Sequence, residues 1–127
     1  MSESLSIEVK PFGVRVLIVE PGGFRTNFLG QGAMQVMPVP EAYKGTAVED
    51  VGRYFAEMDN KQLGDPEKGV GVIYDFVMGE GVGKGKEHLL RLPIGSDCYK
   101  RATEALKEKL ENIEQLKDVA ASTDIPQ

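Results

Sequence analysis

The sequence has very little of several residue types, and each shortage excludes a class of protein. It holds one cysteine, Cys98, and one histidine, His88. Cys98 cannot form an internal disulfide, and this pair falls short of the four ligands of an ordinary structural zinc site. We therefore expect no metal site and a reducing compartment.

Long apolar runs and an excess of positive charge are also missing. No apolar stretch approaches the roughly 18 residues that span a bilayer, and residues 1–4 lack the basic start of a signal peptide. Acidic side chains number 20 against 15 Lys and Arg, which gives a net charge of −5. This balance disfavours nucleic acid and anionic membranes as partners. We expect a cytoplasmic protein that binds neither.

What remains is the composition of one globular domain, with 41% apolar and 28% charged residues in a chain of 127. Residues 14–20 form a nearly continuous β-branched apolar run before Pro21, which predicts a strand buried on both faces. Residues 88–92 predict a second short strand that Pro93 ends. The segment before the first strand is ambiguous, because residues 5, 7 and 9 fit a strand period while 5 and 9 also fit a helix.

Three helices are indicated by their start signals. Thr46 and Glu49 form a capping pair before an apolar face. Asp65 is a suitable N-cap ahead of Pro66. Residues 95–97 open the longest helix, whose apolar stripe continues to Ala120. A helical crossover between two buried strands favours parallel pairing. The predicted fold is α/β: a partial Rossmann-like, doubly wound fold with two parallel strands and about three helices.

Residues 9–26 are where a family resemblance begins. Pro11-Phe12-Gly13, the strand and Pro21-Gly22-Gly23-Phe24-Arg25-Thr26 resemble the sixth-strand region of short-chain dehydrogenases/reductases. Residues 64–68 resemble the start of the helix before the family's last strand. Residues 90–97 resemble that strand and the opening of a C-terminal helix. The likeness runs from about Ser2 to Val119, so residues 1–121 are expected to be a truncated C-terminal segment of this family, and 122–127 a frayed tail.

The family's catalytic residues are not found in the sequence. The resemblance places its phosphate-binding glycine turn, its catalytic Ser and its Tyr-x-x-x-Lys pair upstream of Met1. None of the tyrosines, Tyr43, Tyr54, Tyr74 and Tyr99, is followed by Lys four residues later. We therefore expect no catalytic residue in this chain and a start at an internal methionine. Residues 79–85 match Gly-x-x-x-Gly-x-Gly by letter, but they follow a predicted helix, so we interpret them as a loop.

The resemblance implies a cofactor-binding loop at Pro21, Gly22, Gly23 and Thr26, which would meet the nicotinamide of NAD or NADP in a full-length enzyme. For this chain alone, a strand-ending turn with a local Thr26 hydrogen bond is the favoured interpretation. Five apolar side chains fall in the family's substrate loop, and either an apolar substrate or simple surface exposure accounts for them: Phe24, Phe28, Met34, Met37 and Tyr43. Neither His88 nor Cys98 is expected to be catalytic.

The expected function is that of a C-terminal fragment of an NAD(P)-dependent short-chain oxidoreductase, inactive and without cofactor when alone. A small-molecule substrate would bind only if the missing half completed the site. The alternative is a truncated interaction or regulatory protein with a non-enzymatic binding role. The resemblance also implies a homo-oligomer, with pairing through residues 88–92 and the helix over 65–78.

Overall fold

The computed structural model describes residues 1–30, 33 and 37–125. Strands β1 (Ile18–Pro21) and β2 (Arg91–Ile94) form a parallel pair, with Ile18 opposite Arg91 and Pro21 opposite Ile94. Between the strands lie helices α2 (Ala47–Met58) and α3 (Pro66–Met78). Helix α1 (Ser2–Val9) precedes β1, and α4 (Ser96–Gln115) and α5 (Lys117–Ala121) follow β2. The predicted α/β class with two parallel strands is confirmed.

The predicted strand bounds are wrong at both strands. Residues 14–17 lie outside β1, because the ladder starts where the Ile18 N–H donates to the Leu90 carbonyl at 2.8 Å. A strand extends only as far as a neighbour can accept its hydrogen bonds, and β2 contributes just four residues. Pro93 lies inside β2, opposite Glu20, rather than ending it. An edge strand tolerates proline because one side of it needs no N–H donor.

The helix starts confirm the capping predictions. The Thr46 hydroxyl accepts from the Val48 N–H at 3.3 Å, and the Glu49 carboxylate reaches back to the Gly45 N–H at 2.7 Å. The Asp65 carboxylate accepts from the N–H groups of Glu67 and Lys68 at 3.0 and 3.3 Å. These caps work because they involve only neighbours within one turn, so the sequence carries the whole signal.

Two helical regions differ from expectation. The ambiguous segment before β1 is the helix α1, which a 3₁₀ turn over Lys10–Phe12 and Gly13 at φ 71° bring to an end. The predicted long helix breaks at Leu116, whose backbone leaves the helical region at φ −99°, ψ 5°. Its N–H bonds to the Ile113 carbonyl at 3.1 Å, a tighter turn that separates α4 from α5. The tail remains a prediction, and residues 126–127 lie outside the described part.

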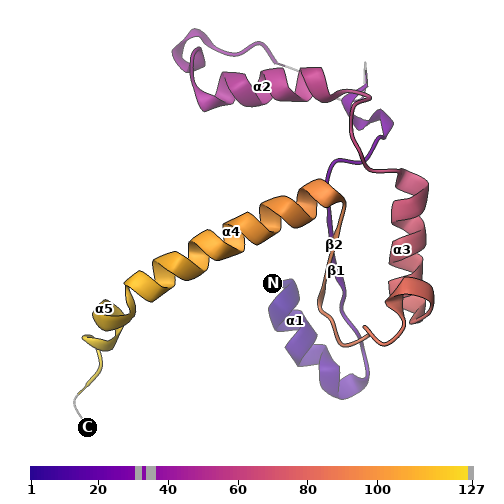
Figure 1. Cartoon of the computed structure of the whole chain (residues 1–127), viewed down its shortest axis with the longest axis vertical. Coiled ribbons are helices and arrows are strands. Elements are labelled where there is room, and N and C mark those ends of the chain that lie inside the picture. Colours follow the sequence, from indigo (N-terminus) through magenta and orange to yellow (C-terminus); the bar gives the residue numbers. More distant parts are fainter. Residues whose placement is uncertain (31–32, 34–36, 126–127) are drawn as a thin grey trace.

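Figure 1 shows how few elements pack together. The strand pair lies between α1 on one side and α3 on the other, while α2 and α4 extend away from it as separate arms. Among the described residues, the buried apolar side chains of the core are Phe76 of α3 and Leu92 of β2, at 8% and 5% exposure. The hydrophobic core of the described part is therefore very small.

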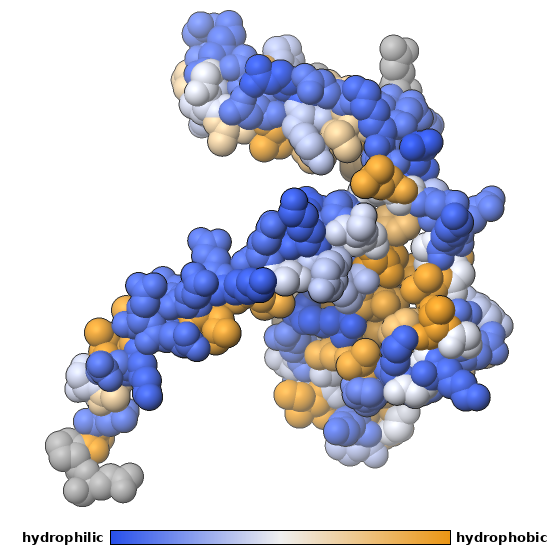
Figure 2. Space-filling model, in the orientation of Figure 1, coloured by the Kyte–Doolittle hydropathy of each residue, from blue (hydrophilic) through white to orange (hydrophobic). Residues whose placement is uncertain are grey.

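The amphipathic faces predicted for α2 and α4 remain uncovered in this chain. In α2, Val48 and Val51 are each 52% exposed, and in α4 Leu106 and Ile113 are about two-thirds exposed. Apolar side chains accordingly appear at the surface on α4 and on the side of α2 that faces it (Figure 2). Within the described ranges, no helix is both long and apolar enough to cross a membrane.

Candidate functional site

The site is built where the carboxyl ends of β1 and β2 meet. Directly after β1, the Gly22 N–H donates to the Ile94 carbonyl at 2.8 Å, which continues the ladder by one bond. The Gly23 N–H then donates to the Asp97 carboxylate, also at 2.8 Å. A Cβ on Gly22 would overlap that carboxylate, so any other residue here would displace the Asp97 side chain. Two glycines therefore let the loop after β1 approach the start of α4 closely.

Asp97 is the charged group at the centre of this junction. The Gly23 N–H is the largest cause that lowers the pKa of the Asp97 carboxyl below its ordinary value; partial burial opposes the shift, and the Cys98 N–H and Arg101 add to it. The Arg101 guanidinium lies 3.2 Å away on the next turn of α4. Asp97 is thus a carboxylate whose hydrogen bonds are already committed to the loop.

The rest of the loop is fixed against the start of α3. Phe24 forms a parallel bridge with Gly64, in which the Gly64 N–H donates to the Gly23 carbonyl at 3.0 Å. The Phe24 ring lies over Gly69 of α3, where a Cβ would come within 2.6 Å of a ring carbon. Gly64 and Gly69 therefore leave the space that the aromatic ring fills.

Thr26 caps a short turn in this structure. Its hydroxyl accepts from the Phe28 N–H at 3.3 Å and so caps the 3₁₀ turn Asn27–Leu29. This is the interpretation that the sequence favoured for the chain alone.

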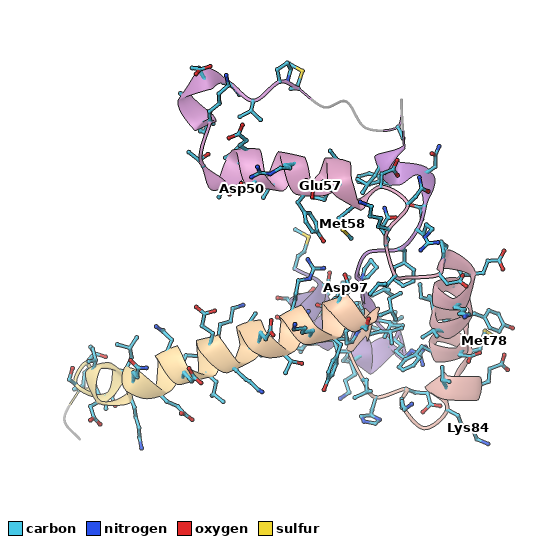
Figure 3. All side chains as sticks on the ribbon, turned by 45° about the horizontal axis from the view of Figure 1, so that its top comes forward. Asp50, Glu57, Met58, Met78, Lys84 and Asp97 are labelled. Atoms are coloured by element: carbon cyan, nitrogen blue, oxygen red, sulfur yellow. The ribbon has the colours of Figure 1, made fainter. Side chains whose placement is uncertain are left out.

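A cavity of about 550 Å³ opens beside this loop. All four residues of the predicted cofactor loop line it: Pro21, Gly22, Gly23 and Thr26. Its other walls come from the end of α2, the segment between α2 and α3, the first half of α3 and the first turns of α4. They include Tyr54, Phe55, Met58, Gln62, Val70, Ile73, Asp97 and Arg101. Figure 3 places Met58 at the end of α2 and Asp97 at the start of α4. The volume is within the range of small-molecule sites.

The predicted substrate loop divides between the cavity and the surface. Phe24 and Phe28 line the cavity. Met37 and Tyr43 do not belong to the lining residues and are 78% and 52% exposed. Their exposure fits the simpler of the two interpretations. Met34 lies outside the described residues.

The glycine-rich loop over 79–85 is folded around an acidic side chain. The Asp75 carboxylate accepts from the Val82 N–H at 3.1 Å, and it lies where a Cβ on Gly81 would be. The Asp75 carbonyl accepts from the Glu80 N–H at 3.0 Å. A carboxylate therefore takes the position in which an anion would have to bind. This arrangement supports the interpretation of 79–85 as a loop and not a phosphate site.

Cys98 and His88, the two other side chains that could take part in catalysis, are hydrogen-bonded and exposed, respectively. The Cys98 thiol donates to the Glu20 carbonyl at 3.1 Å, and His88 is exposed. In the part of the chain that the structure describes, no three His, Cys, Asp or Glu side chains come together as metal ligands.

Comparison with known proteins identifies the architecture. A crystal structure of a short-chain dehydrogenase from Streptomyces avermitilis is 33% identical, with a TM-score of 0.75, over 98% of this chain and 42% of that one. Oxidoreductase BOA17 from Botryotinia fuckeliana is 38% identical over 108 residues. An uncharacterized oxidoreductase of Bacillus subtilis, YusZ, is 30% identical over 99 residues. No family model matches.

This chain is a C-terminal segment of a short-chain dehydrogenase/reductase. It spans about a third of the length of the two curated relatives, which cover 82% and 74% of it. The Streptomyces structure matches this short-chain dehydrogenase segment along nearly its whole length, α4 and the strand pair included. The resemblance inferred from residues 2–119 is thereby confirmed.

Several residues of this dehydrogenase segment escaped the sequence analysis. Asp97 could have been found, because the carboxyl ends of adjacent parallel strands meet at one edge and Asp97 follows β2 by three residues. Gln62 and the α2 side chains Tyr54, Phe55 and Met58 carry no such signal. Their place in the cavity depends on how α2 is oriented, which is set by packing between distant segments.

Proposed function

We propose that this chain acts as the nicotinamide-side and substrate-side portion of an NAD(P)-dependent short-chain oxidoreductase. The observation that carries the proposal is the convergence of Pro21, Gly22, Gly23 and Thr26 on one cavity at the carboxyl ends of parallel strands. In open α/β folds, this edge is where ligands bind. The related oxidoreductases support the same chemistry.

The residues present fit only one end of a dinucleotide. Gly22 and Gly23 offer bare backbone beside an apolar wall, which suits the flat nicotinamide ring. The other glycine-rich loop, over 79–85, is filled by Asp75 and fits no pyrophosphate. When bound, the cofactor supplies or accepts the hydride. The chain's own residues shape the wall, exclude water and hold the loop through Asp97, and proton transfer falls to residues that this sequence lacks.

The purified chain should therefore neither bind nor turn over the cofactor. Calorimetry with NADH and NADPH should show no binding at micromolar concentration, and absorbance should show no reduction of carbonyl compounds. Micromolar affinity for either cofactor would contradict this part of the proposal.

A chimera tests the positive part. Residues 1–121 would replace the matching segment of the Streptomyces avermitilis short-chain dehydrogenase. The folded chimera should oxidise or reduce with a nicotinamide cofactor, and Gly22→Leu should abolish that turnover because the side chain would displace Asp97 from the loop. Gly71→Ala is the matched control, since a Cβ there meets no atom within 4 Å. A folded chimera without activity would overturn the proposal.

The alternative is an interaction protein, and one observation favours it: the apolar faces of α2 and α4 are exposed. Both proposed functions are compatible with a homo-oligomer. The α3 face that includes Tyr74 and Val77 is more than half exposed at both positions. We propose that a second copy of the chain covers it.

A further inference from the structure

The side-chain amide of Gln62 lies buried without a partner for its oxygen. Gln62 is 6% exposed, and among the described residues it is the buried polar side chain. No group in the part of the chain that the structure describes donates a hydrogen bond to its Oε1. Buried acceptors in folded proteins are nearly always paired. The unmatched oxygen therefore indicates a donor from outside the described part of the chain.

The position of Gln62 is fixed by two neighbours on the loop after β1. Its backbone carbonyl accepts from the Arg25 guanidinium, at 3.3 Å from Nε and 3.1 Å from Nη2. Its Cβ and Cγ lie 3.8 Å from the place where a Cβ of Gly23 would stand. The side chain is therefore packed against the loop, and its amide cannot turn freely into solvent.

Gln62 lines the cavity beside the loop, where the side chains of Thr26 and Asp97 already have partners. The Thr26 hydroxyl accepts from the Phe28 N–H, and Asp97 is bonded to Gly23 and Arg101. The cavity that Gln62 lines also has apolar walls. They include four aromatic residues, Phe24, Phe28, Tyr54 and Phe55, and the aliphatic residues Leu29 and Ile73. Tyr54 and Phe55 pack edge to face, with their ring centroids 5.8 Å apart.

The geometry points to a specific class of ligand for this cavity: a largely apolar, ring-containing molecule with a hydroxyl or N–H group that donates to Gln62 Oε1. This inference rests on the proposed function, because the same cavity would hold the substrate of the oxidoreductase. Gln62 would then determine substrate specificity by binding a part of the substrate that does not react. A site built to accept a hydrogen bond discriminates against analogues that lack the donor.

The test uses the whole 127-residue chain and two probes that differ in one donor. β-Naphthol carries a hydroxyl group, and its methyl ether has the same rings without a donor. Calorimetry should show that β-naphthol binds about tenfold more tightly, the ratio that corresponds to one hydrogen bond. Amide shifts of Gly23, Phe24 and Gln62 in two-dimensional NMR should report where both probes bind.

A variant pair isolates the amide. Gln62→Met keeps the length and removes the acceptor, so the two probes should bind equally, with the ether bound no more weakly than before. Gln115→Met is the control, because Gln115 is exposed at the end of α4 and does not line the cavity. This variant should keep the preference for β-naphthol.

Three results would overturn the inference: equal affinities in the unmodified chain, no binding of either probe, or shifts confined to α4. The comparison of the two probes needs no variant, so it holds even if Gln62→Met fails to fold. The chimera separates this inference from the proposed function. An active chimera with equal probe affinities would remove only the role of Gln62, whereas selective binding with a folded, inactive chimera would remove only the proposed function.

Discussion

Asp97 joins the ends of both strands through one carboxylate. It lies in the first turn of α4, three residues after β2, and accepts the N–H of Gly23, two residues after β1. The first turn of a helix favours negative charge, because its N–H groups carry partial positive charge. A charge-assisted hydrogen bond therefore joins the predicted cofactor loop to the start of α4.

The first prediction concerns the protonation of Asp97. Its folded-state pKa lies below the ordinary value of 3.8, chiefly because the Gly23 N–H bonds the charged form. A depressed pKa contributes stability above the unfolded-state pKa, and that contribution is lost as the pH falls through the folded-state pKa. We expect the Gly23 amide resonance to titrate below pH 3.8.

Asp97→Asn provides the control for this titration. The substitution keeps the shape of the side chain and removes the charge, so the Gly23 amide should no longer move with pH. The amide oxygen can still accept from the Gly23 N–H, so the loop should lose about 1 kcal/mol, the difference between a charge-assisted and a neutral hydrogen bond. A Gly23 amide that titrates equally in both proteins would contradict the assignment.

At the scale of elements, the sequence predicts local features well and non-local ones poorly. Thr46 and Asp65 cap α2 and α3 as predicted, because a cap involves only the first turn of its own helix. The bounds of β1 were wrong because they depend on where β2 stops. The family motif pointed to the loop whose residues line the cavity, and its cofactor role stays a prediction. Gln62 was missed because nothing near it in the sequence indicates its burial.

The second prediction contrasts two glycines of α3. A Cβ on Gly69 would lie 2.6 Å from the Phe24 ring, whereas a Cβ on Gly71 would meet nothing within 4 Å. Gly69→Ala should destabilise the chain by about 1–3 kcal/mol, because the ring must shift out of its place. Gly71→Ala should stabilise it by about 0.5–1 kcal/mol through helix propensity. Urea denaturation measures both, and equal effects would argue against the packing of Phe24 on α3.

At the scale of the whole molecule, surface area is the main feature. The chain exposes 10626 Å², whereas a folded monomer of 13.9 kDa is expected to expose about 6,700 Å². The excess of about 4,000 Å² per chain is larger than the area that one partner usually buries in an obligate complex. The uncovered faces of α2, α3 and α4 contribute to this excess, and each of them exposes large apolar side chains.

The third prediction follows from that excess. Analytical ultracentrifugation at micromolar concentration should detect a dimer or a larger species. Val77→Glu, on the exposed face of α3, should shift the equilibrium toward monomer, because it would bury a charge in the interface. Val119→Glu is the matched control, since Val119 is similarly exposed, at 61% against 55%, but lies in α5. A folded monomer of the unmodified chain would contradict the proposed homo-oligomer.

The fourth prediction concerns the ion pairs of Arg91, which bind α1 to the sheet. The guanidinium of this β2 residue contacts Glu20 of β1 and, at 2.5 Å, Glu3 of α1. Both partners of the Glu3 pair are about half exposed or more, so dissolved ions screen it strongly. Raising the salt concentration should weaken the attachment of α1 before it affects β2. Hydrogen–deuterium exchange should show faster exchange over residues 2–9, and Arg91→Gln should produce the same result in dilute buffer.

The same contact makes the first helix a detachable part of the molecule. An isolated helix of eight residues is too short to persist in water, so once the Arg91 contact is released, α1 should unfold rather than swing away intact. The segment ahead of β1 would then be accessible to proteases, while the strand pair and α3 stay folded and resist cleavage. The site of the first proteolytic cut should therefore depend on ionic strength. In concentrated salt, that cut should move to residues 2–9.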